Sequence, residues 1–213
     1  MKNYFDFLAT GDLIKDIKGY FLKYGKHDTY EHTLDVINEL YGIEKHFGYI
    51  EPGSLRACYC HDLGRVVGND EIVDFCIEHN IEVLDEERQL PSILHQKISC
   101  LIAEKVFGIN DKTVLEAIKY HTTSRKNPSM TEIEVFLADK LSWKEFEYSK
   151  LTLEMKEVMK LSKESAIFCY LSDLYNNREK LKVYHLDSKE AYEYFNEDYK
   201  IDRSNINGYR YKT

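Results

Sequence analysis

The stretch Ala57-Cys58-Tyr59-Cys60-His61-Asp62-Leu63-Gly64-Arg65 places a histidine and an aspartate side by side in an otherwise apolar run. Burying both polar groups without partners would cost several kcal/mol. A divalent transition metal would satisfy both, because neutral imidazole and carboxylate are good ligands for such ions. The dipeptide alone is weak evidence, so the remaining ligands have to be sought elsewhere in the chain.

The overall composition is that of an ordinary globular protein. The 213 residues are 43% hydrophobic and 31% charged, enough for one well-cored domain, or one domain with an appendage. The net charge of −8 argues against binding to nucleic-acid polymers or acidic membranes, which requires a basic surface. No apolar run approaches the roughly 20 residues that span a bilayer, and the N-terminus has no apolar signal core. We therefore expect a cytoplasmic protein.

The five cysteines lie in apolar surroundings, and their odd number indicates reduced thiols in a cytosolic protein. Cys58 and Cys60 form a C-x-C spacing with no second pair. They are therefore interpreted as small hydrophobic core residues and not as a structural zinc site.

The hydrophobic periodicity predicts an all-α protein, a helical bundle with a C-terminal helical extension. No alternation of period two is long enough to predict a sheet, and no internal repeat is present. Caps and glycines set the expected helix limits, with Asp111 capping one helix and Ser129 or Thr131 beginning a capping box before another. The acidic segment 84–88 is predicted to be a connection. The expected helices are 12–24, 29–46, 55–62, 70–80, 92–107, 112–121, 130–141 and a helical region over 151–184.

Polar residues that are typical metal ligands recur on the apolar sides of these helices. A single inward histidine is more often a hydrogen-bonded core residue than a ligand. However, several histidines and two aspartates desolvated at one centre without a cation would be very costly. Helical bundles commonly build metal centres from such inward side chains on facing helices. The candidate ligands are His32, His61, Asp62, His95, His121 and Asp139.

The order of these residues resembles that of the HD superfamily of metal-dependent phosphohydrolases. The resemblance covers about residues 29–141 and is closest to the YqeK-type branch, the symmetrical diadenosine tetraphosphatases, and its near relatives. Besides His61-Asp62, the specific matches are three blocks in order: Ile93-Leu94-His95, Ala117-Ile118-Lys119-Tyr120-His121-Thr122-Thr123 and Phe136-Leu137-Ala138-Asp139-Lys140.

The resemblance implies two divalent ions, typically iron, with manganese or another divalent ion able to substitute. By analogy, His32, His61, Asp62 and Asp139 hold one ion, while His95 and His121 hold the second and Asp62 bridges. A bridging hydroxide would then attack phosphorus while cations stabilise the transition state. Asp62, Arg65 and Arg125 are the predicted catalytic residues. The predicted substrate-binding residues are Arg65, Thr122, Thr123, Arg125 and Lys140.

Several positions depart from the YqeK-type pattern. Arg65 stands where many relatives carry lysine, and the loop 124–130 is longer and more basic than in that branch. Lys140 directly follows Asp139, so it is expected on a different helix face, where a solvated surface position is an equal alternative. Trp143 is the single tryptophan and could stack on a nucleobase, although a core or hinge position is favoured. These departures do not change the candidate metal ligands. They lie at positions expected to contact the substrate, so they leave the identity of the substrate open.

The leading hypothesis is cleavage of a dinucleoside polyphosphate, diadenosine tetraphosphate to ADP. A nucleotide or nucleoside-monophosphate phosphatase, a nucleotide-binding sensor without turnover and a purely structural helical protein are the alternatives. We expect a core over residues 1–145 and an extension over residues 146–213. The tyrosines and phenylalanine of the extension could pack on the core or form a homodimer contact; they are Tyr192, Tyr194, Phe195 and Tyr199.

Overall fold

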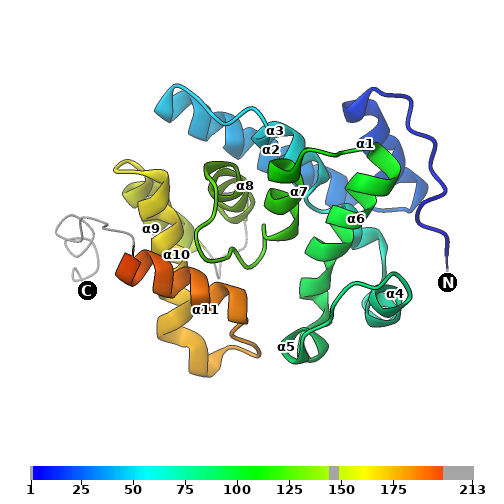
Figure 1. Cartoon of the computed structure of the whole chain (residues 1–213). Coiled ribbons are helices and arrows are strands. Elements are labelled where there is room, and N and C mark those ends of the chain that lie inside the picture. The colour runs from blue at the N-terminus through cyan, green and yellow to red at the C-terminus, as the bar shows by residue number, and fades with distance from the viewer. Residues whose placement is uncertain (1, 144–148, 199–213) are drawn as a thin grey trace.

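The computed structural model describes residues 2–143 and 149–198, and Figure 1 shows their arrangement. No β-strand occurs within these ranges, which confirms the all-α prediction. Within the same two ranges, no helix is both long enough and apolar enough to cross a membrane. Tyr199, which the sequence left open as a packing or homodimer-contact residue, lies outside the described residues.

Six helices form the part of the molecule that carries the candidate ligands. Helices α2, α3, α7 and α8 pack on one another, while α6 packs on α7 and on the short 3₁₀ helix η1. Their apolar faces share one core, which includes Val36, Leu40, Ile98, Ile118 and Leu137. The bounds of these six are α2 His27–Phe47, α3 Ser54–Cys60, η1 Leu63–Val66, α6 His95–Phe107, α7 Lys112–Lys119 and α8 Met130–Leu141. Helix α1, Leu13–Lys23, packs on α2 and α3.

The C-terminal helices gather on one side of the bundle, opposite α1 and α4 (Figure 1). Helix α10 packs against α8, α9 and α11. The extension is therefore in direct contact with the bundle, and the division at residue 145 stays a prediction. The remaining bounds are α4 Ile72–Glu78, α5 Asp85–Gln89, η2 Pro91–Leu94, α9 Ser149–Met159, α10 Lys163–Asn177, η4 Arg178–Lys180, α11 Leu186–Glu193 and the π-helical turn η5 Tyr194–Asp198.

Local sequence signals account for most of the helix ends. The carboxylates of Asp12 and Asp111 accept hydrogen bonds from the first-turn amides of α1 and α7. Ser129 and Glu132 form the expected capping box of α8. Gly48 and Gly108 end α2 and α6 in the left-handed conformation that glycine adopts without strain.

Three expectations about the elements were wrong. Helix α3 ends at Cys60, so His61 and Asp62 lie in the turn that follows it. Helix α2 begins at His27 instead of Thr29, because the chain has already reversed at Gly25, where φ is positive. The acidic segment 84–88 lies mostly in a helix, α5, because Glu87 is buried against Lys97 and His185.

Candidate metal centre

The six predicted ligands meet at one site although they come from five segments of the chain. His32 projects from α2, His95 is the first residue of α6 and Asp139 lies in the last turns of α8. The other three stand in turns directly after α3 and α7; they are His61, Asp62 and His121. All except His32 are at least 95% buried.

The two carboxylate oxygens of Asp62 face different pairs of histidines. Its Oδ2 lies 3.8 Å from His32 Nε2 and 3.6 Å from His61 Nε2. Its Oδ1 lies 3.1 Å from His95 Nε2 and 3.6 Å from His121 Nε2. Asp139 Oδ1 completes the first group, at 3.1 Å from His32 Nε2 and 3.8 Å from His61 Nε2. Asp62 is therefore placed to join two separate ligand groups.

Three of the histidines have the same internal hydrogen bond. The Nδ1–H of His61, His95 and His121 donates to the backbone carbonyl three residues earlier, at 2.8, 2.5 and 2.8 Å. Each bond leaves the Nε2 lone pair facing Asp62, which is the usual outer-shell arrangement of a metal-ligating imidazole. The fold itself therefore selects the tautomer that can bind a cation.

The buried nitrogen atoms of the site show that the residues present fit a metal ion. Among the described residues, His61 Nε2 is buried without a hydrogen-bond partner. The Nε2 atoms of His95 and His121 lie 3.0 Å apart, and with both Nδ1 atoms protonated their lone pairs face each other. A cation between these groups would satisfy the orphaned acceptors, and the nitrogen and oxygen donors suit a divalent transition metal. Two candidate ligand clusters share Asp62: His32, His61 and Asp62, and Asp62, His95 and His121.

The electrostatics of the site favour ligands in their metal-binding forms. Burial lowers the pKa of His61 and of His95 to about 4, so both imidazoles are neutral near pH 7. Burial alone would raise the pKa of Asp62, but His61 and Arg65 hold it well below its usual range. The neighbouring Lys140 ammonium, with His32, has the same effect on the pKa of Asp139.

A cavity of about 410 Å³, here called the metal pocket, opens over these ligands. The Nε of Arg65, half-exposed at its rim, donates to Asp62 Oδ1 at 3.2 Å. The Nζ of Lys140 donates to Asp139 Oδ2 at 2.7 Å. The residues that line the pocket are Asp28, Thr29, His32, Asp62, Arg65, Thr122, Asp139, Lys140, Trp143 and Tyr170.

Two of the candidate cations lie in different surroundings. Lys140 is not a solvated surface residue, since it is 2% exposed and its ammonium lies between Asp139 and the aromatic rings of Phe136 and Trp143. Arg125 does not line the metal pocket: its guanidinium donates to Glu132 and Glu116 instead. The backbone reverses at Ser124, where φ is +59°, and this turn directs Arg125 to the start of α8.

The two threonines after His121 lie in different surroundings. Thr122 Oγ1 is 3.1 Å from His121 Nε2 and lines the metal pocket. Thr123 Oγ1 instead accepts a hydrogen bond from Gln96 Nε2 at 3.2 Å, and it does not line that pocket. The buried Gln96 also accepts from the Thr122 backbone amide at 3.0 Å, so this side chain fixes the turn that carries both threonines.

Some residues of the site escaped the sequence analysis. Asp28 and Thr29 stand one helical turn before His32, so their spacing on α2 could have identified them. Tyr170 and Gln96 carried no such signal, because a tyrosine in an apolar helix and a glutamine beside a histidine are both ordinary.

Gly64 also carried no signal in the sequence. Its amide donates to Ser99 Oγ at 2.8 Å, and a Cβ there would overlap the His95 carbonyl oxygen and lie 2.8 Å from the Ser99 amide nitrogen.

Comparisons with known proteins agree with this geometry. An uncharacterized protein from the pepC 5′ region of Lactococcus lactis subsp. cremoris is 36% identical over 125 residues, which is 59% of this chain and 63% of the relative. The symmetrical bis(5′-nucleosyl)-tetraphosphatase of Staphylococcus aureus is 34% identical over 92 residues, 38% of this chain and 47% of that enzyme. The enzyme of the same name from Halalkalibacterium halodurans is 29% identical over 110 residues, 52% of this chain and 58% of the relative. The matches therefore span between about half and 63% of these relatives.

A solved structure shares the fold over most of its length. It is a crystal structure from Clostridium acetobutylicum, described as a predicted HD superfamily hydrolase involved in NAD metabolism. The TM-score is 0.76 at 23% identity, and the match covers 90% of this chain and 99% of that one. The family model described as HD domain matches residues 29–144, the segment that contains all six clustered ligands. The chain belongs to the HD domain family.

Proposed function

We propose that this protein is a metal-dependent phosphohydrolase that cleaves a dinucleoside polyphosphate, converting diadenosine tetraphosphate to ADP. The observation that carries the proposal is the division of the Asp62 carboxylate between two histidine groups, below a cavity rimmed by two cations. The names of the relatives from S. aureus and H. halodurans support the choice of substrate.

The proposed roles of the ligands follow from their grouping. His32, His61 and Asp139 would hold one ion with Asp62 Oδ2, and His95 and His121 would hold the other with Asp62 Oδ1. When bound, two such ions polarise a phosphoryl group and acidify water near neutral pH. His61 and His95 need no proton transfer before they bind, because both imidazoles are already neutral near pH 7.

Arg65, Lys140 and Thr122 are placed to bind the phosphate chain. Arg65 lines the metal pocket and donates its Nε–H to Asp62, so its terminal guanidinium nitrogens would serve as donors for phosphate oxygens. Lys140 has three donors, of which one goes to Asp139. Both cations would stabilise the negative charge that develops on the equatorial oxygens of the transition state.

A substrate screen with iron- and manganese-loaded protein tests the proposal, with products separated by chromatography. We expect diadenosine tetraphosphate to give ADP alone, and Asp62→Ala or chelation to reduce turnover to the protein-free level. Arg65→Ala should raise the KM by about tenfold, the effect of one lost charge-assisted contact of about 1.4 kcal/mol. Arg88→Ala, on the exposed side of α5, is the matched control and should behave as the unchanged protein.

The products separate the competing functions. Release of inorganic phosphate from mononucleotides, with no ADP from diadenosine tetraphosphate, would support the phosphomonoesterase instead. A metal-loaded protein that cleaves no nucleotide would contradict the proposal and favour a nucleotide sensor. Elemental analysis that finds no bound metal after loading would contradict both enzyme functions.

A further inference from the structure

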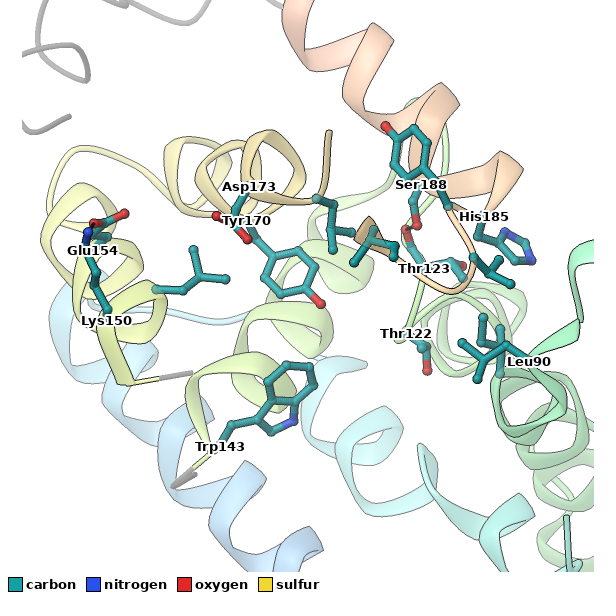
Figure 2. A pocket seen from close by; sticks show the side chains of 16 residues that line it. Leu90, Thr122, Thr123, Trp143, Lys150, Glu154, Tyr170, Asp173, His185 and Ser188 are labelled. Atoms are coloured by element: carbon teal, nitrogen blue, oxygen red, sulfur yellow. Dashed lines mark hydrogen bonds and ion pairs between the residues drawn. The ribbon is translucent and has the colours of Figure 1, made fainter. Parts of the chain in front are cut away.

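A second cavity, of about 540 Å³, adjoins the metal pocket and is here called the side pocket. The two share three lining residues, Thr122, Trp143 and Tyr170. Figure 2 shows Trp143 and Tyr170 on one side of the space and Thr122 across from them. The other walls come largely from α9, α10 and the segment 181–188. The side pocket is therefore built mainly by the C-terminal third, for which the sequence indicated no role.

The lining of the side pocket is mostly apolar and includes aromatic faces. The rings of Trp143 and Tyr170 lie with centroids 6.3 Å apart at 72°, and Lys140 Nζ lies 4.7 Å from the Trp143 centroid. The cation thus stands at the boundary between the two pockets. The apolar walls are Leu90, Ile93, Leu151, Leu174, Leu181 and Val183. A cavity with a largely apolar surface and several polar side chains is the usual form of a small-molecule site.

The polar groups of the side pocket suit a neutral ligand that has hydrogen-bond donors. Asp173 Oδ1 accepts from Asn177 Nδ2 at 3.1 Å, and no lysine or arginine in the described ranges pairs with this carboxylate. The Tyr184 hydroxyl is buried and has no partner among the described residues. The only lysine of the lining, Lys150, is exposed and 3.9 Å from Glu154. An anionic group would be disfavoured beside Asp173, whereas a planar heterocycle with N–H or O–H groups would be stabilised.

We propose that the side pocket binds the nucleoside of the substrate. The base packs against Trp143 and Tyr170, and donors of the base or ribose bind Asp173, while the phosphates pass Thr122 to reach Arg65 and Lys140 in the metal pocket. This inference rests on the proposed hydrolysis of a nucleotide, and it makes the C-terminal third the part of the chain that selects the substrate.

Adenosine, which carries no phosphate, tests the side pocket in the metal-free protein. Trp143 is the single tryptophan of the chain, so its fluorescence reports binding directly. We expect saturable quenching by adenosine. Val183→Phe, which fills the side pocket, and Asp173→Asn, which removes the charge, should each weaken binding by about tenfold or more. Asp74→Asn, on the exposed side of α4 and outside both pockets, is the matched control.

Two analogues identify the donor that Asp173 binds. If 2′-deoxyadenosine binds equally to the wild type and to Asp173→Asn, the ribose supplies the donor. If purine riboside, which lacks the amino group of adenosine, binds equally to the wild type and to Asp173→Asn, the base supplies the donor. Either result supports the proposal. Absence of quenching up to the solubility of adenosine, or unchanged affinity in both Val183→Phe and Asp173→Asn, would overturn it.

Steady-state kinetics separate this inference from the proposed function. Val183→Phe should raise the KM for diadenosine tetraphosphate with little change in kcat, and should leave hydrolysis of tripolyphosphate unaffected. Adenosine binding without cleavage of any nucleotide would contradict only the proposed function. Cleavage of diadenosine tetraphosphate with no effect of Val183→Phe on the KM would contradict only the side-pocket inference.

Discussion

At the residue scale, the candidate centre depends on three imidazoles that are oriented by their own turns. His61, His95 and His121 each donate Nδ1–H to the carbonyl three residues earlier. The hydrogen bond needs no partner from another helix, so it forms as soon as the local turn forms. Only the assembly of the Nε2 atoms around Asp62 depends on tertiary packing.

The neutral histidines should make the metal-free protein sensitive to acid. Burial sets the pKa of His61 and of His95 at about 4, whereas histidines of the unfolded chain titrate near 6.5. Between these values the unfolded state binds more protons. We therefore expect the free energy of unfolding to fall with decreasing pH, by up to about 1.4 kcal/mol per pH unit for each histidine.

Urea denaturation in the presence of a chelator, at several pH values between 7 and about 4, measures this slope. His32 has the opposite effect on the free energy of unfolding as the pH falls. Its burial would lower its pKa, but its contacts with Asp139 and Asp62 outweigh the burial and raise the pKa. His61→Gln should make the slope shallower, while His27→Gln, at an exposed position in the first turn of α2, should leave it unchanged. A stability that is constant over this range would show that the histidines are not held neutral.

The sequence predicted which polar residues lie together at the site, but not their surroundings. His32, His61, Asp62, His95, His121 and Asp139 were identified as polar exceptions in apolar segments, and the fold brings all six together. Their assignment to metal ions stays a proposal. The position of Lys140 could not be predicted, because its burial depends on Trp143 and on Tyr170, which lies 30 residues further along the chain. The predicted role of Arg125 stays a prediction, and nothing in the sequence indicated that Glu116 and Glu132 bind its guanidinium.

At the element scale, a buried ion pair joins the C-terminal helices to the bundle. Lys163 Nζ, at the start of α10, lies 2.5 Å from Glu134 Oε1 on α8, and both side chains are at least 97% buried. Glu134 Oε2 also accepts hydrogen bonds from Ser54 Oγ and the Glu51 amide, at 2.5 and 2.9 Å. One carboxylate thus holds three segments: α8, α10 and the start of α3.

Removal of this lysine should destabilise the protein strongly. We expect Lys163→Met to lower the free energy of unfolding by about 3–5 kcal/mol, because it leaves the Glu134 charge buried without its cation. Lys160→Met is the matched control: its pair with Glu157 is exposed, so the loss should be under about 1 kcal/mol. Chemical denaturation measures both. Similar losses in the two variants would show that the buried pair is not the link between α8 and α10.

Element limits were predictable where a cap determines them. Asp12, Asp111 and Ser129 begin helices in the structure as the sequence indicated. Helix α5 was missed because its acidic sequence resembles a solvated connection. Its Glu87 is buried only because Lys97 Nζ lies at 2.8 Å and His185 Nε2 at 3.4 Å. Partners so distant in the sequence give no local signal.

At the scale of the whole molecule, the candidate centre connects most of the bundle. Its ligands come from α2, α6, α8 and the turns after α3 and α7, so bound ions would link segments that are far apart in the chain. A ligand that binds only the folded state stabilises it by mass action. The metal should therefore stabilise the entire fold and not only the site.

Thermal unfolding with and without Mn²⁺ measures this effect. At a Mn²⁺ concentration 100 times the Kd, the expected stabilisation is about 2.7 kcal/mol, which corresponds to an increase in Tm of about 5–10 °C for a chain of this size. Excess chelator should reverse the increase. Asp62→Ala should show almost none, because both ligand groups lose their shared residue. An equal increase in the Tm of this variant would show that the stabilising ion binds elsewhere.

The close approach at Gly64 has a consequence for how this centre can change. The backbone after Asp62 lies directly against the first turn of α6, which begins with His95, and a single hydrogen atom separates them at Gly64. One added methyl group would overlap the His95 carbonyl oxygen, so a side chain at this position would push the segment that carries Asp62 away from the first turn of α6 without replacing any candidate ligand. The spacing of the two candidate ligand groups thus depends on a residue that is not itself a candidate ligand.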